Sequence, residues 1–470
     1  MTPLTDRSHG GGPPPRQQSR SAPPRSGVSD RSLLTAALLV WGAVALIGLV
    51  FGPVLGHDEA AFALAARGQA PPGAWLYRSD GTIAIARIGI ALGGAAWQLR
   101  LTSAVLSPLV LVAVYAVGRA AFTARTGAWA AAVLAGAHPM ALRSAELLSD
   151  LPATAGIVGG IAILVSELDR DGGPRRRIVA AAPLFAAAFY LRYGSAPVVA
   201  LAIAAAGLLW WRAIVRRPLP VLAMVAALGV LVVPHVVRSL DATGSILGIL
   251  QASAAMPRRA YVGEGLVTYL TSDPFLFYGF LAAPVMVAGV AGLFRARRKA
   301  PWFLAIVALG QLALLGINTH GQPRYVFAAT ALLVVLGVDI LARHRLARPR
   351  LALGLVATSW LGVLVAAPIY YHHIDDARAP LIAASDALRA DSAGRPCAVI
   401  ALIVPQLMWY SPCEVYASGL LGEPLPADRV RYAASFTSWP IDVAALLTAE
   451  HLEAAPVATR DPRAELWRLH

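Results

Sequence analysis

The stretch SLLTAALLVWGAVALIGLVFGPVL, residues 32–55, decides the class of protein because it carries no charged side chain over its whole length. As a helix it is long enough to cross the roughly 30 Å of hydrocarbon in a bilayer. A cleaved signal peptide has a shorter apolar segment and a small-residue cleavage site, so we interpret this stretch as an uncleaved first membrane helix. Residues 1–31 are rich in Gly, Pro, Ser and Arg. That composition predicts a disordered tail, and its arginines predict that the tail lies in the cytoplasm.

The whole chain has the composition of a membrane protein. Of its 470 residues, 57% are hydrophobic and only 14% are charged, with a mean hydropathy of +0.61. A soluble domain carries about 25% charged residues, so an ordinary cytosolic enzyme is excluded. The net charge of +14 is spread over short basic clusters between apolar stretches. Membrane topology explains such clusters, so we predict a bilayer and no nucleic acid as partner.

Ten more apolar stretches bring the number of predicted membrane helices to about eleven. With the N-terminus inside, the loops placed in the cytoplasm carry the densest basic clusters of the chain, as the positive-inside bias requires. The odd number of spans then places the C-terminal segment outside. The ten stretches are 101–118, 127–142, 151–166, 178–191, 195–211, 218–237, 276–294, 302–317, 325–341 and 351–368.

Two long loops are predicted on the outer side of the membrane, at residues 56–100 and 239–274. Within the first, residues 82–98 are apolar but contain Arg87. A charge near the centre of a bilayer is costly, so we predict that this segment is an interfacial helix instead of a span.

Residues 371–470 differ from the predicted transmembrane domain, residues 32–370, because they contain charges, prolines and short alternations. We predict here a small α/β domain outside the membrane, with parallel strands. Cys397 and Cys413 are either a disulfide, which an oxidising periplasm permits, or two buried thiols. The predicted elements are a helix at 375–390, a strand at 397–404, a helical turn at 406–410 and a second strand at 413–416. The predicted fold is thus an all-α polytopic membrane protein with this C-terminal α/β domain.

Two acidic segments are predicted on the outer side. His57, Asp58 and Glu59 follow the first span directly, and Glu146 and Asp150 lie in the loop between the third and fourth spans. One carboxylate could deprotonate an acceptor, while another orients it or holds a metal. Asp58 and Asp150 are the candidate ligands if a divalent ion is bound. The structural alternative is that Asp58 and Asp150 only cap the helices that they begin.

Basic and aromatic residues lie at the outer ends of two later spans. Arg192 and Tyr193 end the fifth, and His320, Arg324 and Tyr325 precede or open the tenth. Arginine presents a planar, permanently charged fork that suits phosphate. The alternative is that these side chains only reach from the bilayer to its interface.

In order and spacing, these motifs resemble the GT-C class of polytopic glycosyltransferases. The chain is close to the bacterial protein O-mannosyltransferase-like group, glycosyltransferase family 39, and is also similar to the aminoarabinose lipid A transferases. The resemblance covers about residues 33–345. It rests on Gly56-His57-Asp58-Glu59-Ala60, Phe62, Ala65-Ala66-Arg67, Arg100-Leu101, Gly118-Arg119, Gly127, His138-Pro139, Arg143-Ser144, Ser149-Asp150-Leu151-Pro152 and Arg324-Tyr325.

The resemblance implies a polyprenyl-phosphate sugar as donor, and an envelope protein, lipid or glycan as acceptor, at the outer face of the cytoplasmic membrane. It implies that Asp58 is the acceptor-activating base, with Glu59 supporting it and Asp150 as a second acidic residue. Arg192 stands where the family often has a lysine that meets the donor phosphate. No cofactor is certain, although some relatives place a divalent metal near the loop carboxylates.

A flippase or transporter of lipid-linked sugars is the alternative function, since it could also have charged outer loops. Transporters usually show internal repeats and broken helices at the bilayer midplane. The sequence shows no repeat, and the polar candidates gather at one face, which favours an enzyme.

Overall fold

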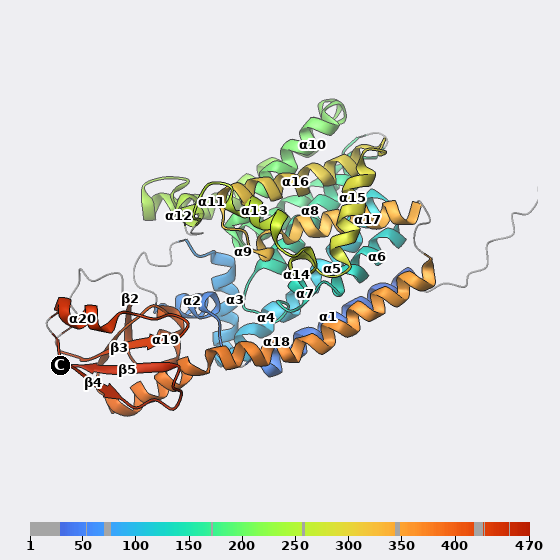
Figure 1. The fold of residues 1–470 in the computed structure, drawn as a ribbon. Coiled ribbons are helices and arrows are strands. Elements are labelled where there is room, and N and C mark those ends of the chain that lie inside the picture. Colours follow the sequence, from blue (N-terminus) through green and yellow to red (C-terminus); the bar gives the residue numbers. More distant parts are fainter. Residues whose placement is uncertain are drawn as a thin grey trace, which may run out of the picture.

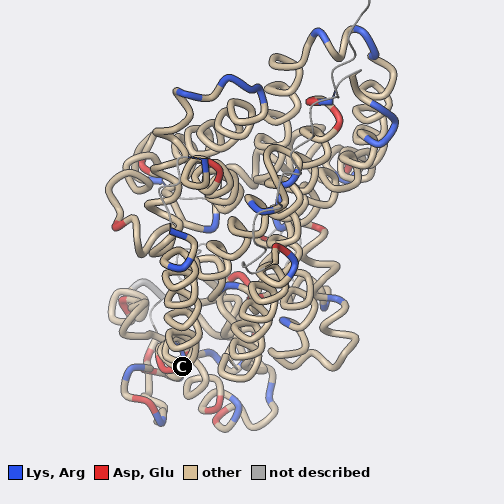
Figure 2. Tube along the Cα trace, turned by 90° about the vertical axis from the view of Figure 1, so that its right-hand side faces the viewer, with Lys and Arg blue, Asp and Glu red and all other residues tan. Residues whose placement is uncertain are grey.

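The structure is a computed structural model, and it describes residues 29–52, 54–69, 77–170, 173–255, 259–343, 348–417, 426, 428–450 and 452–470. The predicted N-terminal tail lies almost entirely outside this range. A helical bundle and a smaller sheet domain are joined by one long helix, α18, which is orange in Figure 1. Figure 2 shows long stretches of the bundle without a charged residue.

Eight helical stretches among the described residues are long and apolar enough to cross a membrane. Each corresponds to one of the spans predicted from the sequence, because a run of about 20 apolar residues forms a helix of bilayer length. Two stretches begin with a short 3-10 turn, and a third consists of α4 and α5, which meet at Ser107 and Pro108. The stretches are Asp30–Phe51 (α1), Ala96–Ala121 (α4 and α5), Asp150–Leu168 (α8), Tyr193–Arg216 (η2 and α10), Pro218–Thr243 (α11), Lys299–Asn318 (α16), Pro323–Arg343 (η3 and α17) and Pro349–Ser392 (α18).

The other three predicted spans are shorter helices inside the bundle. They are α6 (Ala124–Ala135), α9 (Ala181–Leu191) and α15 (Ala282–Leu293). At 1.5 Å per residue, a helix of this length reaches about 18 Å, which is less than the hydrocarbon thickness. Most of α6 is buried, and α15 packs closely on α17.

The segment after α1 contains two helices, which build one side of the site together with α4, the first part of the next membrane-length stretch. Its first helix is α2 (His57–Ala66), and α3 (Asp80–Ala91) packs on both α2 and α4 (Ala96–Leu106). The helix predicted at 82–98 is therefore interrupted after Ala91. Gly93 and Gly94 have positive φ angles of 128° and 78°, a conformation that glycine adopts readily, and they turn the chain into α4.

The C-terminal domain is the predicted α/β unit, extended by three strands. β1 (Cys397–Ala401) lies parallel to β2 (Glu414–Ala417) on one side and to β3 (Val430–Phe436) on the other. β5 (Ala464–Leu469) joins β3 antiparallel, and β4 (Ala454–Val457) forms the far edge. The helix predicted at 375–390 is the C-terminal end of α18, so the last span and this domain share one continuous helix.

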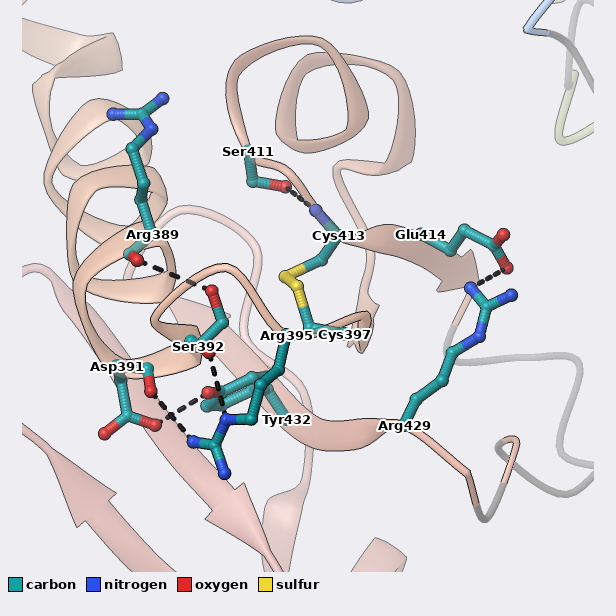
Figure 3. Close-up of a disulfide and its surroundings, with 10 residues drawn as sticks. All are labelled: Arg389, Asp391, Ser392, Arg395, Cys397, Ser411, Cys413, Glu414, Arg429 and Tyr432. Carbon is teal, nitrogen blue, oxygen red and sulfur yellow. Dashed lines mark hydrogen bonds and ion pairs between the residues drawn. A yellow bond between two sulfur atoms is a disulfide. The ribbon is translucent and has the colours of Figure 1, made fainter.

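A disulfide joins Cys397 and Cys413, which settles the alternative left open by the sequence (Figure 3). It closes the chain around α19 (Val404–Tyr410), the helix between β1 and β2. The remaining elements are α7 (His138–Ala141), η1 (Arg176–Ala180), α12 (Gly248–Ala255), α13 (Glu264–Thr271), α14 (Pro274–Tyr278) and α20 (Val443–Glu450).

Candidate active site

The first turn of α2 places two adjacent carboxylates in different environments. The helix begins at His57, and the residue before it, Gly56, is the N-cap. Glu59 closes this turn, because its Oε2 accepts a hydrogen bond of 2.7 Å from the Gly56 amide. The interpretation of Asp58 as the cap is therefore wrong, and the Asp58 side chain points elsewhere.

Glu59 is buried and forms a two-pronged ion pair with Arg100 of α4. Both side chains are in the interior, each residue being 3% exposed. Nε and Nη2 of Arg100 donate to the two carboxylate oxygens, each at 2.7 Å. The Leu147 amide donates a further bond of 2.8 Å to Glu59. Glu59 thus ties α2 to α4 and to the loop before α8.

Burial favours the neutral form of Glu59, but the Arg100 guanidinium outweighs this effect and lowers the pKa of Glu59 from 4.5 to about 2. A carboxyl whose pKa is lower in the folded protein stabilises the fold at pH values above its unfolded pKa, and this contribution is lost as the pH falls toward the folded pKa. We expect the contribution of this ion pair to the melting temperature in detergent to stay constant between about pH 8 and about pH 5. It should then fall as the pH drops from 4.5 to about 2. An unchanged melting temperature across that acidic range would contradict the ion pair.

Asp58 lines a cavity of about 810 Å³ at the end of the bundle near the C-terminal domain. One of its oxygens accepts from Arg78 Nη1 at 2.7 Å, and the other accepts from Arg324 Nη1 at 2.9 Å. Burial raises the pKa of Asp58, but the two guanidinium groups outweigh it and hold that pKa well below its usual range. The carboxylate is therefore ionised and paired.

Asp150 lines the same cavity from the first turn of α8 and forms an ion pair with Arg192. Arg192 also donates a bond of 3.3 Å to the Arg324 carbonyl, and its guanidinium lies 4.8 Å from the centre of the Tyr325 ring. Arg324 lies 5.6 Å from the same ring. The two acidic segments predicted from the sequence thus reach one cavity, each paired with arginine.

The structure separates the other predicted residues into two groups. His57, Tyr193, His320 and Tyr325 line the cavity together with the two aspartates. Glu59 and Glu146 do not line it. Glu146 pairs instead with Arg143 at 2.8 Å, three positions earlier in the turn between α7 and α8.

Several residues in or beside this cavity are absent from the sequence-based candidates, and three of them are polar or charged residues with a clear place in the site. Arg78 lies in the predicted outer loop, and only its charge outside the cytoplasmic side could have singled it out. Gln311 lies within a span, where a polar side chain is itself a signal. Gln406 comes from the C-terminal domain, and its Oε1 lies 3.2 Å from His57 Nδ1. No sequence pattern indicated that contact.

The C-terminal domain reaches the site through α19. The Arg67 guanidinium lies 3.6 Å from the centre of the Trp409 ring. The Leu55 amide donates a bond of 2.7 Å to the Tyr410 hydroxyl. Together with Gln406, these contacts hold the segment that carries Asp58 against the C-terminal domain.

The charges that line the cavity suit an anion better than a cation. Among the described residues that line the cavity, three carry a guanidinium group (Arg78, Arg192 and Arg324) and two carry a carboxylate, so positive charge exceeds negative charge in the lining. Both aspartates already pair with arginine. In the part of the chain that the structure describes, no three His, Cys, Asp or Glu side chains group as metal ligands would. These residues do not fit a divalent ion, so the metal suggested for Asp58 and Asp150 has no support in the geometry.

Comparisons with known proteins agree with this architecture. Residues 81–237, about a third of the chain, match the family model described as dolichyl-phosphate-mannose-protein mannosyltransferase. The structure of ArnT from Cupriavidus metallidurans in the apo state superposes with a TM-score of 0.67 at 16% identity, covering 93% of this chain and 97% of that one. The chain has the GT-C glycosyltransferase fold. The fold that the resemblance implied is thereby confirmed.

Other proteins with this GT-C fold are also similar in structure. The Archaeoglobus fulgidus oligosaccharyltransferase in the apo form gives a TM-score of 0.58 at 13% identity, covering 87% of this chain and 70% of that one. The arabinofuranosyltransferase AftD from Mycobacteria gives 0.55 at 16%, covering 94% of this chain and 40% of that one. No curated protein matches the sequence. The apolar helices and these neighbours show a multi-pass membrane protein.

Proposed function

We propose that this chain transfers a sugar from a polyprenyl-phosphate donor to an envelope acceptor at the outer face of the cytoplasmic membrane. The observation that carries the proposal is the cavity in which Asp58, Asp150 and three arginines meet. The structural similarity extends to ArnT from Cupriavidus metallidurans bound to undecaprenyl phosphate, with a TM-score of 0.67 at 15% identity. A lipid phosphate is the anion that such a cavity, open within a membrane protein, would take.

The arginines would bind the donor phosphate and stabilise it as a leaving group. Arg192 donates to the backbone carbonyl of Arg324, and both guanidinium groups lie against the Tyr325 ring. Guanidinium groups can donate two parallel bonds to phosphate oxygens, and they keep their charge in a desolvated site. Donors fixed where negative charge develops lower the barrier to breaking the sugar–phosphate bond.

Asp58 would serve as the general base after the donor has bound. In the resting site two guanidinium groups compete with an acceptor proton for the Asp58 oxygens. A bound phosphate offers Arg324 and Arg78 another anion, which would release a carboxylate oxygen and raise the proton affinity of Asp58. Donor binding would in this way prepare the base for its acceptor.

The atoms of the transfer balance without a cofactor. The acceptor O–H bond breaks and its proton goes to an Asp58 oxygen. The acceptor oxygen forms a bond to the anomeric carbon, and the sugar–phosphate bond breaks with its electron pair going to the phosphate. Asp58 returns its proton to solvent when the lipid phosphate leaves and the ion pairs form again.

Arg192→Ala should weaken binding of undecaprenyl phosphate by about 10- to 100-fold, because a charge-assisted hydrogen bond contributes about 1.5–3 kcal/mol. Binding to the purified protein in nanodiscs measures this effect. Arg212→Ala is a matched control, since Arg212 lies at the far end of α10, is exposed and does not line the cavity. An unchanged affinity in Arg192→Ala would remove this residue from the phosphate site.

The function itself is tested in proteoliposomes that contain the purified protein, undecaprenyl phosphate carrying a radiolabelled sugar, and envelope extract as acceptor. Transfer releases free undecaprenyl phosphate and moves the label to a new product. Movement of the intact donor across the bilayer without release would instead support a transporter and would overturn the proposal.

A further inference from the structure

Gln311 is a buried polar residue in the cavity that has one hydrogen-bonding atom to spare. It lies on α16, a helix of membrane-spanning length, and is 4% exposed. Its Nε2 donates a bond of 2.8 Å to the Tyr325 carbonyl. Among the residues that the structure places, its Oε1 has no hydrogen-bond partner.

An unpartnered amide oxygen inside a membrane-spanning helix is unfavourable unless a ligand or water satisfies it. Lipid headgroups cannot reach this oxygen, because the Gln311 side chain is buried inside the bundle and lines the internal cavity. The bond to Tyr325 fixes which end of the amide remains available. The unpartnered end is an acceptor only and is itself buried, so an N–H or O–H donor on an occupant of the cavity that Gln311 lines can satisfy it after a small rotation of the side chain.

The position of Gln311 relative to the arginines limits which chemical group of a bound donor can lie beside it. Tyr325, whose carbonyl anchors Gln311, has both Arg192 and Arg324 against its ring. The occupant near Gln311 is thus the group next to the phosphate. An ionised phosphate diester has no proton to donate, and a prenyl chain has no polar hydrogen. A sugar offers several hydroxyl groups.

We propose that Gln311 determines donor specificity by accepting a hydrogen bond from a hydroxyl group of the sugar. This inference rests on the proposed function, because it assumes a sugar attached to the lipid phosphate. It assigns recognition of the lipid phosphate to the arginines and recognition of the sugar to Gln311. A site built to bond a hydroxyl rejects analogues that lack it.

The test compares sugar-bearing and sugar-free lipids in the same protein. Undecaprenyl phosphate, undecaprenyl phosphate mannose and undecaprenyl phosphate arabinofuranose are titrated against the wild-type protein and Gln311→Met in nanodiscs. Met has a similar length and no acceptor oxygen of this kind. For the sugar that the wild type prefers, the affinity ratio over undecaprenyl phosphate should fall by about 5- to 10-fold in the variant.

The ratio separates recognition from a structural effect. Loss of the Tyr325 contact alone would displace the arginines and weaken all three lipids alike, which leaves the ratio unchanged and overturns this inference. A wild-type protein that binds all three lipids equally also overturns it. Failure to bind undecaprenyl phosphate at all would instead overturn the proposed function.

Thr330→Val is the matched control for a buried polar group replaced by an apolar one. Thr330 lies on α17 outside the cavity lining, and its hydroxyl donates to the carbonyl of Val326, the last residue of the preceding turn η3. The affinity ratio in this variant should equal that of the wild type. A reduced ratio in Thr330→Val would show that Gln311→Met acts through general loosening of the bundle, which would contradict the specific role.

Discussion

Asp58→Asn is expected to lower the rate of sugar transfer by about 10²- to 10⁴-fold, the usual contribution of a general base. The amide keeps the shape of the side chain but cannot take the acceptor proton. It also cannot balance the charges of Arg78 and Arg324, its two partners. The measurement is the transfer rate in proteoliposomes at saturating donor, together with binding of undecaprenyl phosphate.

The two readouts together distinguish a base from a phosphate ligand. Binding of undecaprenyl phosphate should persist in Asp58→Asn, or become tighter, because the phosphate no longer competes with a carboxylate for the arginines. Asp169→Asn is a control, since Asp169 pairs with the exposed Arg298 and does not line the cavity. A wild-type transfer rate in Asp58→Asn would exclude Asp58 as the base.

Arg100→Met is expected to be the most destabilising single change in the site region. Breaking a buried ion pair by removing one partner costs about 3–5 kcal/mol, because the other charge stays buried without compensation. Among the residues that the structure describes, Glu59 would keep its bonds to the Gly56 and Leu147 amides but no hydrogen bond to a cation. The yield of monodisperse protein and its melting temperature in detergent measure the loss.

A double variant, Glu59→Met with Arg100→Met, should recover part of this stability, since two apolar side chains of similar volume can replace a buried pair. The comparison also defines the role of Glu59. A Glu59→Gln protein that keeps its wild-type melting temperature but loses transfer as fully as Asp58→Asn would contradict a positioning role and would restore Glu59 as a catalytic residue.

Local composition and pattern were enough to predict much of this molecule. Apolar runs of bilayer length appear as the eight long helices, because desolvation of the backbone leaves such runs no alternative to a helix. The parallel strands on either side of α19 followed from short apolar runs separated by a helical turn. Asp58 and Asp150 were predicted to converge because topology placed both on one side, and they line one cavity.

Contacts between side chains that lie far apart in the sequence could not be predicted from local composition and pattern. Adjacent carboxylates look equivalent in sequence, yet Asp58 faces the cavity and Glu59 is buried against Arg100, 41 positions away. This division depends on how α2 is rotated against α4, which only packing decides. Arg78 and Gln406 reach the site from a loop and from another domain, and neither belongs to a periodic pattern. Three spans were expected to be longer, since hydropathy does not show where a helix ends inside a bundle.

The disulfide that brackets α19 makes oxidation of the C-terminal domain a condition for ordering the segment that carries Asp58. Cys397 and Cys413 bracket the helix whose Gln406, Trp409 and Tyr410 hold the neighbourhood of Asp58. A chain whose Cys397 and Cys413 thiols stay reduced would lack this cross-link. The same would hold for a chain inserted in the opposite orientation, with its C-terminal domain in a reducing compartment. Thiol oxidation would thus couple correct insertion to competence for the proposed sugar transfer.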